Sequence, residues 1–518
     1  MKKLKISAWV LAFLMLAPMA CDDKFEEVNQ NPNFPEVVPA ELLMPTIMRN
    51  PINDWASLAW NYGNVVMQYT AKIQFTNEDR YNWGPQGSPW NTFYNALRDV
   101  KNLIETSEVS GATNYQAIAR IMRAWMYHVM TDSYGDVPFT EATQGKEGVN
   151  TPAFDPQETV YQGILADLET ANSLLNGLNI STQGDILYGG NLLRWQKFAN
   201  SLRLRILMRL SDRNNPSAAM QAILNDPVNN PIFESNEDQA ALTYLADEPN
   251  QQPLYTTRSG SFDEFRLSEN MEDILKDIDD PRLFVYAQPT NNSGAGVVSA
   301  NEEDYQGVPN GLGDEEALQY APNGNPAQGG SNFISRVGLI FACRACNNNA
   351  SPIGAQTVLM SYAELQFILA EAAERGFITG NAETYYLNGI QASFDYYEER
   401  LTVAGSNYDP IRAVIQPGAD YFTQPGVAYT GTQAERLAKI GQQKWIALFF
   451  NGMEAWFDWR RTGFPTITPG PANLNNDQVP VRFMYPSSVQ ALNGENYQAV
   501  ITRQGADNIN TRMWWDVD

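Results

Sequence analysis

The chain has 518 residues, of which 59 are acidic and 35 are basic, so its formal net charge is −24 at pH 7. This excess of acidic side chains excludes nucleic acid as a default partner. Hydrophobic residues make up 43% of the chain and charged residues 18%, a composition that excludes disordered and fibrous proteins and predicts a large buried core.

The first residues have the features of an export signal. Three lysines begin the chain, an apolar run extends from Ile6 to Ala20, and Cys21 follows. The apolar run is shorter than the ~20 residues that a membrane-spanning helix needs. We therefore predict a signal peptide over residues 1–20 and a lipid on Cys21, although Pro18 stands where lipoprotein signals usually have leucine.

A first block of helices is predicted for residues of about 40–225. One apolar face with helical spacing runs from Ile118 to Val129 and ends before Gly135. The sequence Asp155-Pro-Gln-Glu158 predicts a capping box, with Asp155 as the N-cap of a helix that ends near Gly177.

The same helical spacing continues further along the chain. A third helix is predicted from Trp195 to Leu210, before the breaker Asn214-Asn-Pro216. A second helical block covers residues of about 355–465. In it Ser361 and Thr432 are each followed by a glutamate three residues later, which predicts two more helix starts.

The segment between the blocks, about residues 225–355, lacks strong periodicity and is rich in Asn, Gly, Pro, Gln and Ser. We predict long structured loops with a few short strands. Cys343 and Cys346 lie here with C-x-x-C spacing, which fits either a small disulfide or a redox pair. The asparagines that follow indicate a loop, which favours the structural disulfide in an exported protein.

The sequence offers few candidate catalytic residues. The only histidine, His128, lies three residues after Trp125 on the buried helix face, so a hydrogen-bonded core histidine is the better interpretation. Phosphate-binding loops, serine-hydrolase elbows and calcium loops do not occur in the sequence. The many carboxylates give no specific signal for glycosidase chemistry. We therefore predict no catalytic residue, no metal site and no cofactor.

The segment from Arg80 to Trp90 predicts a carbohydrate-binding loop. A sugar ring needs a flat aromatic face for its apolar side, with amide or guanidinium groups for its hydroxyls. Tyr81 and Trp83 are expected to supply the aromatic face, and Arg80 and Asn82 the polar groups. Trp90 fits a ligand contact and the packing of a helix start equally well.

Two secondary ligand candidates, Arg258 and Tyr305, lie in the loop-rich middle segment. Ordinary loop packing would explain both equally well. Trp456 and Trp459 are at helical spacing, which favours a packing role.

Several segments, in their order along the chain, resemble the SusD/RagB family of surface lipoproteins, and the resemblance covers nearly the whole chain. These segments are Cys21-Asp-Asp-Lys-Phe-Glu-Glu, Asn31-Pro-Asn33, Arg123-Ala-Trp-Met-Tyr, Tyr134-Gly-Asp-Val-Pro138, Trp195-Gln-Lys-Phe-Ala-Asn200, Asp280-Pro-Arg282, Tyr362-Ala-Glu-Leu-Gln-Phe and Glu454-Ala-Trp-Phe-Asp-Trp-Arg460. The resemblance implies a mainly α-helical fold, with tetratricopeptide-like helix pairs that form a right-handed scaffold under a loop-rich ligand face. It also implies one domain over residues 21–518.

In function, the resemblance implies a protein that is not an enzyme. It would be lipid-anchored on the exposed face of the outer membrane, capture an oligosaccharide and deliver it to a partner SusC-like TonB-dependent transporter, acting as its lid. Three alternatives remain from the sequence: a peptide-binding member of the family, a surface glycoside hydrolase, and a purely structural surface protein. Nucleic acid is not an expected partner.

Overall fold

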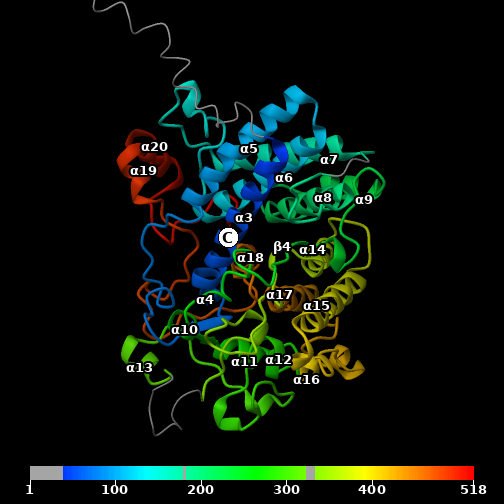
Figure 1. Cartoon of the computed structure of the whole chain (residues 1–518), viewed down its shortest axis with the longest axis vertical. Helices are drawn as coiled ribbons and strands as arrows, with labels where there is room; N and C mark the ends of the chain where they lie inside the picture. Colours follow the sequence, from blue (N-terminus) through cyan, green and yellow to red (C-terminus); the bar gives the residue numbers. More distant parts are fainter. Residues whose placement is uncertain (1–38, 179–181, 322–332, 518) are drawn as a thin grey trace, which may run out of the picture.

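The computed structural model describes residues 39–178, 182–321 and 333–517, so the predicted signal peptide and Cys21 lie outside the described part. The fold is mainly α-helical, as predicted (Figure 1). The helices and strands are α3 (Ala40–Leu58), α4 (Asn64–Val66), β1 (Thr70–Lys72), α5 (Trp90–Ser110), α6 (Thr113–Tyr134), α7 (Gln157–Leu175), α8 (Leu192–Arg209), α9 (Ser217–Asn225), β2 (Ala240–Leu242), α10 (Ser259–Asp263), β3 (Phe265–Leu267), α11 (Glu269–Lys276), α12 (Leu283–Tyr286), α13 (Asp314–Leu318), β4 (Thr357–Met360), α14 (Tyr362–Glu374), α15 (Ala382–Ala404), α16 (Asp409–Arg412), α17 (Gln433–Ala447), α18 (Gly452–Thr462), α19 (Ser487–Leu492) and α20 (Gly494–Gln504).

Helices α5 to α8 form the first helical block. Each packs against the next, and α3 packs against α5. The short connection between α5 and α6 contains Gly111, whose φ of 72° is a backbone conformation that favours glycine. α6 is buried around most of its circumference, from Ile118 to Tyr134, and therefore forms the centre of this block.

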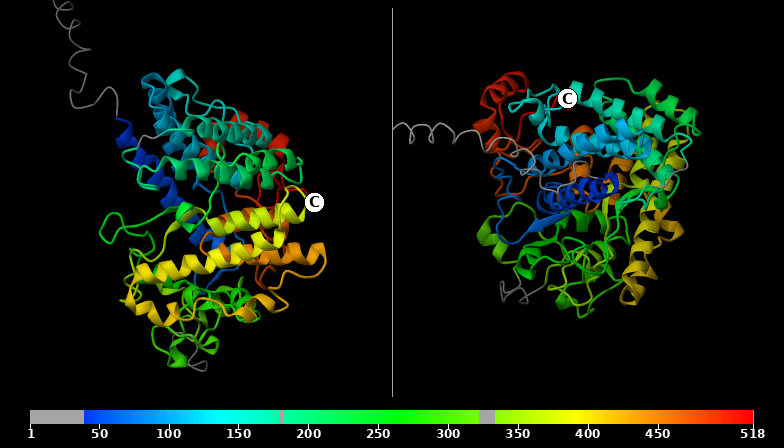
Figure 2. Two further views of the ribbon diagram at one scale, coloured as in Figure 1. Left: turned by 90° about the vertical axis from the view of Figure 1, so that its right-hand side faces the viewer. Right: turned by 45° about the horizontal axis from the view of Figure 1, so that its top comes forward.

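Helices α14, α15 and α17 form the second block, and they run side by side below the first block in the left view of Figure 2. The two blocks share a buried contact, in which Nε of Arg205 on α8 donates to Oε1 of Glu364 on α14 at 2.6 Å. One contiguous hydrophobic core runs from Met44 to Trp515 and includes residues of both blocks.

The predicted helix starts have three different outcomes. Ser361 accepts a hydrogen bond from the backbone N–H of Glu364 and is an N-cap, as predicted. Thr432 and Glu435 form the predicted reciprocal capping box. The predicted cap at Asp155 is wrong, because α7 begins at Gln157 and its N-cap is Pro156.

The carboxylate of Asp155 has a different role in the structure. Its Oδ2 accepts hydrogen bonds from the backbone N–H groups of Phe139 and Thr140, both at 2.9 Å. Asp155 therefore fixes the loop that follows α6, and α7 forms without a side-chain cap.

The middle segment contains the predicted short strands among its loops, and it also contains short helices, α10 to α13, that were not predicted. β3 pairs with β1 in antiparallel orientation, and β2 pairs with β4 in the same way. Each pair joins the middle segment to one of its neighbouring helical blocks. In the same segment, Cys343 and Cys346 are joined as a disulfide.

Candidate functional site

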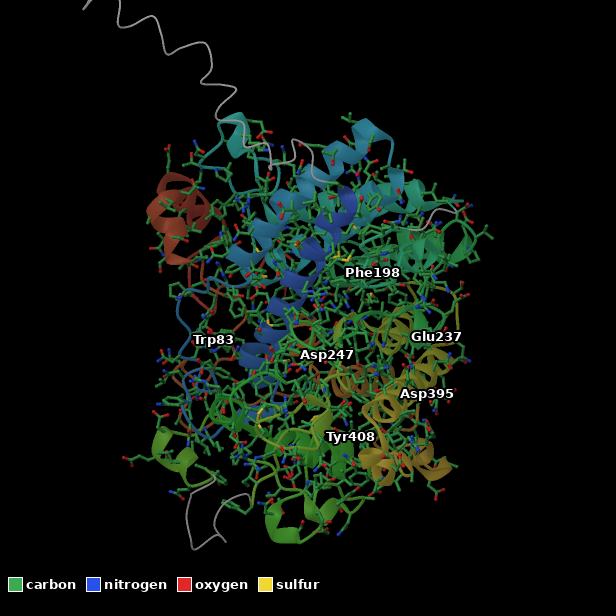
Figure 3. All side chains as sticks on the ribbon, in the orientation of Figure 1. Trp83, Phe198, Glu237, Asp247, Asp395 and Tyr408 are labelled. Carbon is green, nitrogen blue, oxygen red and sulfur yellow. A yellow bond between two sulfur atoms is a disulfide. The ribbon has the colours of Figure 1, made fainter. Side chains whose placement is uncertain are left out.

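The turn that contains Tyr81 and Trp83 is packed against the core. Trp83 is only 6% exposed, and Tyr81 only 3%. The ring of Trp83 has Tyr62, Phe483 and Trp456 around it, with centroid distances of 5.3, 5.5 and 5.6 Å. Figure 3 labels the position of Trp83 in the fold. This differs from the expected open platform, because segments distant in the sequence cover the ring.

The polar residues of this turn also have partners within the protein. Nε of Arg80 donates to the carbonyl oxygen of Ala472 at 2.8 Å. Asn82 is exposed, and its side chain donates to Asn77 at 3.2 Å. Arg80 therefore connects the turn to a later loop, and Asn82 is the most accessible residue of this predicted set.

The two secondary candidates, Arg258 and Tyr305, have different surroundings in the structure. Arg258 is exposed and is the N-cap residue of α10. Tyr305 is 1% exposed, and its hydroxyl donates to the carbonyl oxygen of Ser299 at 2.7 Å. Burial raises the pKa of Tyr305 well above its usual value of 10. Tyr305 is thus a packing residue in this structure, as its alternative interpretation suggested.

Trp90 differs from the other aromatic candidates because it lines a cavity of about 390 Å³. The cavity lies where the first turns of α5 meet the loops around Pro138 and Pro152 and the helix α19. Its lining residues are Trp90, Asn91, Tyr94, Asn95, Pro138, Ala142, Thr143, Pro152, Phe154, Ser488, Val489, Leu492 and Asn493. We call it the Trp90 cavity.

Four aromatic neighbours hold the half-buried ring of Trp90. Its centroid lies 5.0 Å from Tyr94, 5.3 Å from Tyr134, 5.8 Å from Tyr485 and 5.9 Å from Phe154. A ring held in this way loses little conformational entropy when a ligand stacks on it. Both interpretations of Trp90 therefore apply, since it packs the start of α5 and also faces a cavity.

The cavity combines these aromatic groups with amides. The hydroxyl of Tyr94 donates to the carbonyl oxygen of Pro138 at 2.7 Å, and the amide of Asn493 donates to that of Pro152 at 2.7 Å. Asn91 and Asn95 are exposed, and their side chains have no hydrogen-bond partner among the described residues. They are therefore available to the hydroxyls of a sugar.

The Trp90 cavity is also electrically neutral. None of the described residues that line it is Asp, Glu, Lys, Arg or His. Burial raises the pKa of Tyr94 well above its usual value of 10, so its hydroxyl stays neutral. An uncharged lining of aromatic rings and amides suits a neutral saccharide better than an ion.

Sequence reasoning missed the partners of Trp90. The sequence could have indicated Asn91, Tyr94 and Asn95, because they follow Trp90 within about one turn of the predicted helix. Phe154 and Asn493 had no such signal, since only the tertiary fold brings them to the start of α5.

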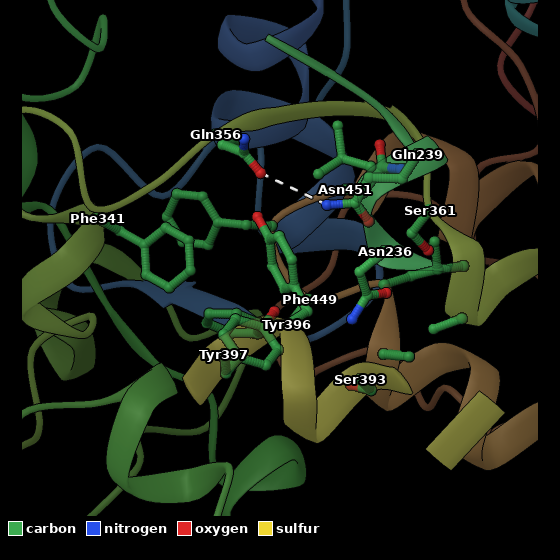
Figure 4. A pocket seen from close by; sticks show the side chains of 15 residues that line it. Asn236, Gln239, Phe341, Gln356, Ser361, Ser393, Tyr396, Tyr397, Phe449 and Asn451 are labelled. Carbon is green, nitrogen blue, oxygen red and sulfur yellow. Dashed lines mark hydrogen bonds between the residues drawn. The ribbon is translucent and has the colours of Figure 1, made fainter. Parts of the chain in front are cut away.

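Another cavity lies between α15 and the strand pair of β2 and β4 (Figure 4). Phe341, Phe449 and Tyr397 line it together with polar residues that include Gln239 and Gln356. Its volume is about 30 Å³, the space of about one water molecule. It is too small to hold a sugar ring.

Three further observations concern other functions. In the described part of the chain, no group of three or more His, Cys, Asp or Glu side chains is arranged to hold a metal ion. His128 is completely buried, with its Nε2 3.0 Å from Oδ2 of Asp132. Among the described helices, none is both long and apolar enough to cross a membrane.

Comparison with known proteins gives one family and many similar structures. Residues 32–486 match the SusD-like family model that is described as starch-binding and associating with the outer membrane. A SusD homologue from Bacteroides fragilis is 28% identical with a TM-score of 0.76, over 92% of this chain and 99% of that chain. A second homologue from the same organism is 26% identical with a TM-score of 0.79, over 93% and 100%.

A third similar structure is named a chitin-binding protein. It is 28% identical to this chain with a TM-score of 0.74, and the match covers 93% of this chain and 100% of that chain. Among curated proteins, none matches this chain.

Proposed function

The chain belongs to the SusD/RagB family of outer-membrane nutrient-binding proteins, and from this membership we propose that it binds a neutral oligosaccharide in the Trp90 cavity. The observation that carries the proposal is the uncharged lining, in which the rings of Trp90, Tyr94 and Phe154 lie beside three asparagines. The rings would cover the apolar face of a sugar, and the amides would bind its hydroxyls. Arg80 and Asn82 do not line the Trp90 cavity, so they would contact only the part of a longer oligosaccharide that extends beyond it.

The cellular role follows from the same membership. We propose that residues 1–20 are removed, that Cys21 carries a lipid, and that residues 21–518 form one domain on the cell surface. The protein would act as the lid of a SusC-like TonB-dependent transporter and deliver the captured oligosaccharide to it. One lipid chain gives limited membrane affinity, so contact with the transporter would add to the attachment.

Two ligands deserve the first test. The similar chitin-binding protein directs attention to oligomers of N-acetylglucosamine, and the description of the family directs attention to starch oligosaccharides. Both are neutral, in agreement with the lining of the Trp90 cavity. Peptides are the second candidate class, because some members of the family bind them.

We expect Trp90→Ala to weaken oligosaccharide binding by about 1–3 kcal/mol, because the substitution removes a buried aromatic contact. Asn95→Ala, at an exposed position, should weaken it by about 1 kcal/mol. Calorimetric titration of the purified mature protein would measure both changes. Trp514→Ala is the control, since Trp514 is half-buried but does not line the cavity.

The same titrations can contradict the proposal. If Trp90→Ala and Asn95→Ala bind the oligosaccharide as the unchanged protein does, the Trp90 cavity is not the site. If only peptides bind, the ligand class is wrong. If the purified protein releases reducing ends from the oligosaccharide, it is a hydrolase and not solely a binding protein.

A further inference from the structure

A separate cavity lies between α3 and the segment that follows β2. Its volume is about 220 Å³. Arg49 and Asn53 line it from α3, and residues 242–245 and 249–251 line it from the other side, with Ile186 between them. It shares no lining residue with the Trp90 cavity. We call it the Arg49 cavity.

Arg49 has no carboxylate partner among the residues that the structure describes. Most cations in the described part of the chain are paired, although several others, such as Arg98 and Arg258, are not. Among the paired cations, Arg205 lies 2.6 Å from Glu364, and Arg282 lies 2.6 Å from Asp280. A partly buried guanidinium without a counterion attracts an anion more strongly than one in open water.

The lining of the Arg49 cavity contains no acidic residue. Asp247, labelled in Figure 3, and Glu248 belong to the same segment, but neither lines the cavity. In a chain with 59 acidic residues, the wall of this cavity therefore carries only a positive charge. This positive charge distinguishes the Arg49 cavity from the neutral Trp90 cavity.

Several hydrogen-bond donors in the lining are unused. The hydroxyl of Tyr244 donates to Oδ1 of Asn53 at 3.0 Å, which leaves the amide N–H groups of Asn53 free of partners among the described residues. Oγ1 of Thr243 accepts from Gln356 at 2.7 Å, so its own hydrogen remains available. The side-chain amide of Asn250 likewise has no partner within the described part of the chain.

A guanidinium and several free donors around one small cavity match the acceptor oxygens of a small anion. We propose that the Arg49 cavity binds the anionic substituent of an acidic saccharide, a carboxylate or a sulfate ester on one sugar ring. The planar guanidinium would bind two oxygens of this group, and the amides of Asn53 and Asn250 would bind its remaining acceptors. The protein thus accepts acidic as well as neutral glycans.

At about 220 Å³, the cavity is smaller than the pockets of about 300–1,000 Å³ that hold drug-sized ligands, so it would hold one sugar ring or its substituent. The ligand class rests on the proposed function, because a saccharide is the nutrient expected at the Trp90 cavity. The requirement for a negative charge on the ligand does not rest on the proposed function. It depends on Arg49 and on the absence of acidic residues from the lining.

The test is calorimetric titration of the purified mature protein with four probes. These are an oligosaccharide of hexuronic acid, the same oligosaccharide with its carboxylates reduced to hydroxymethyl groups, a sulfated neutral oligosaccharide and a short acidic peptide. A neutral oligomer of N-acetylglucosamine reports on the Trp90 cavity in parallel.

We expect the hexuronate oligosaccharide or the sulfated neutral oligosaccharide to bind. The reduced form of the hexuronate should bind at least about tenfold more weakly. Arg49→Gln should weaken binding of the anionic probe by about tenfold or more, the effect of losing hydrogen bonds to a charged group. Arg49→Lys should retain part of the affinity, because it keeps the charge but loses the planar fork. Arg98→Gln is the matched control, since Arg98 is exposed on α5 and lines neither cavity.

Three results would overturn the proposal: neither anionic saccharide binding more tightly than the reduced form, binding that Arg49→Gln leaves unchanged, or binding of the acidic peptide alone. If Arg49→Gln does not fold, the comparison of the hexuronate with its reduced form still decides. If the protein binds the N-acetylglucosamine oligomer but neither anionic saccharide, this inference is refuted and the proposed function stays intact. Failure of all saccharides would refute both.

Discussion

Asp132 lies at the centre of a buried group of charged residues between α6, α8 and α18. Its carboxylate accepts a short hydrogen bond from the hydroxyl of Tyr161, and Oδ2 lies 3.3 Å from Nε of Arg209. Burial alone would raise the pKa of Asp132, but Arg209 and His128 hold it well below its usual value. The only histidine of the chain thus lies in the core beside a carboxylate, which agrees with its interpretation as a core histidine.

Asp79 is a second buried carboxylate, at the base of the turn that contains Tyr81 and Trp83. Its Oδ2 accepts from the backbone N–H of Lys72 at 3.0 Å, and its Oδ1 accepts from the amide of Asn310 at 2.7 Å. Burial raises its pKa to about 6, although these hydrogen bonds oppose the increase. The turn is therefore connected to the loop before α13 by a group that titrates in a mildly acidic range.

This pKa predicts a pH dependence of stability. As the pH rises from 4 to 7, Asp79 ionises first in the unfolded chain, near its ordinary value, and only near 6 in the folded protein. The folded state therefore loses stability over this interval, by about 2 kcal/mol relative to an Asp79→Asn variant. Urea unfolding of both proteins from pH 4 to pH 7 would measure the difference. A difference that does not change with pH would contradict the assigned pKa.

Two helix starts show what a short sequence pattern can and cannot determine. In the Thr432 box, the hydroxyl accepts from the N–H of Glu435 at 3.3 Å, and the carboxylate of Glu435 accepts from the N–H of Thr432 at 2.6 Å. Both partners lie within four residues of each other in the sequence, so the sequence pattern was sufficient to predict the box. Asp155 has the same pattern but bonds to a loop that approaches from α6.

The Thr432 box gives a prediction at the level of one helix. Thr432→Ala should lower the free energy of unfolding by about 1 kcal/mol, because the N-terminal amides of α17 lose their acceptor. Thr430→Ala is the control, since Thr430 is exposed and lies outside the box. Chemical denaturation would measure both variants. An equal effect of the two substitutions would contradict the role of the box.

The C-terminal segment packs between α8 and α18, helices that lie far apart in the sequence. Trp515 is 1% exposed, and the guanidinium groups of Arg209 on α8 and Arg460 on α18 lie 5.4 and 4.9 Å from its ring centroid. It therefore packs against residues of both halves of the chain. One core that includes both blocks predicts that they unfold together.

Trp515→Ala tests this packing. The substitution should lower the free energy of unfolding by about 3–5 kcal/mol, the usual effect of removing a buried tryptophan. Trp514→Ala, at the half-buried neighbouring position, should have a much smaller effect. Differential scanning calorimetry would show whether the transition remains single. A separate early transition for Trp515→Ala would show that the two blocks unfold independently.

The candidate site was only partly predictable from the sequence. The segment from Arg80 to Trp90 was identified by its composition, and Trp90 does line the largest cavity described above. Trp83 was preferred over Trp90 as a ligand contact, but Phe483 and Trp456 cover its ring. Arg49 gave no signal, because a missing ion-pair partner is visible only when the surroundings of the side chain are known.

The sequence by itself determined the helical blocks, the caps at Ser361 and Thr432, and the family. These depend on residues close together in the chain or on the order of segments along it, and both can be read from the sequence. Only the tertiary structure decided which aromatic rings face a cavity, that Asp155 fixes a loop, and where a cation lacks a partner. These properties depend on the packing of distant segments, because exposure and pairing are set by whichever parts of the chain the fold brings together.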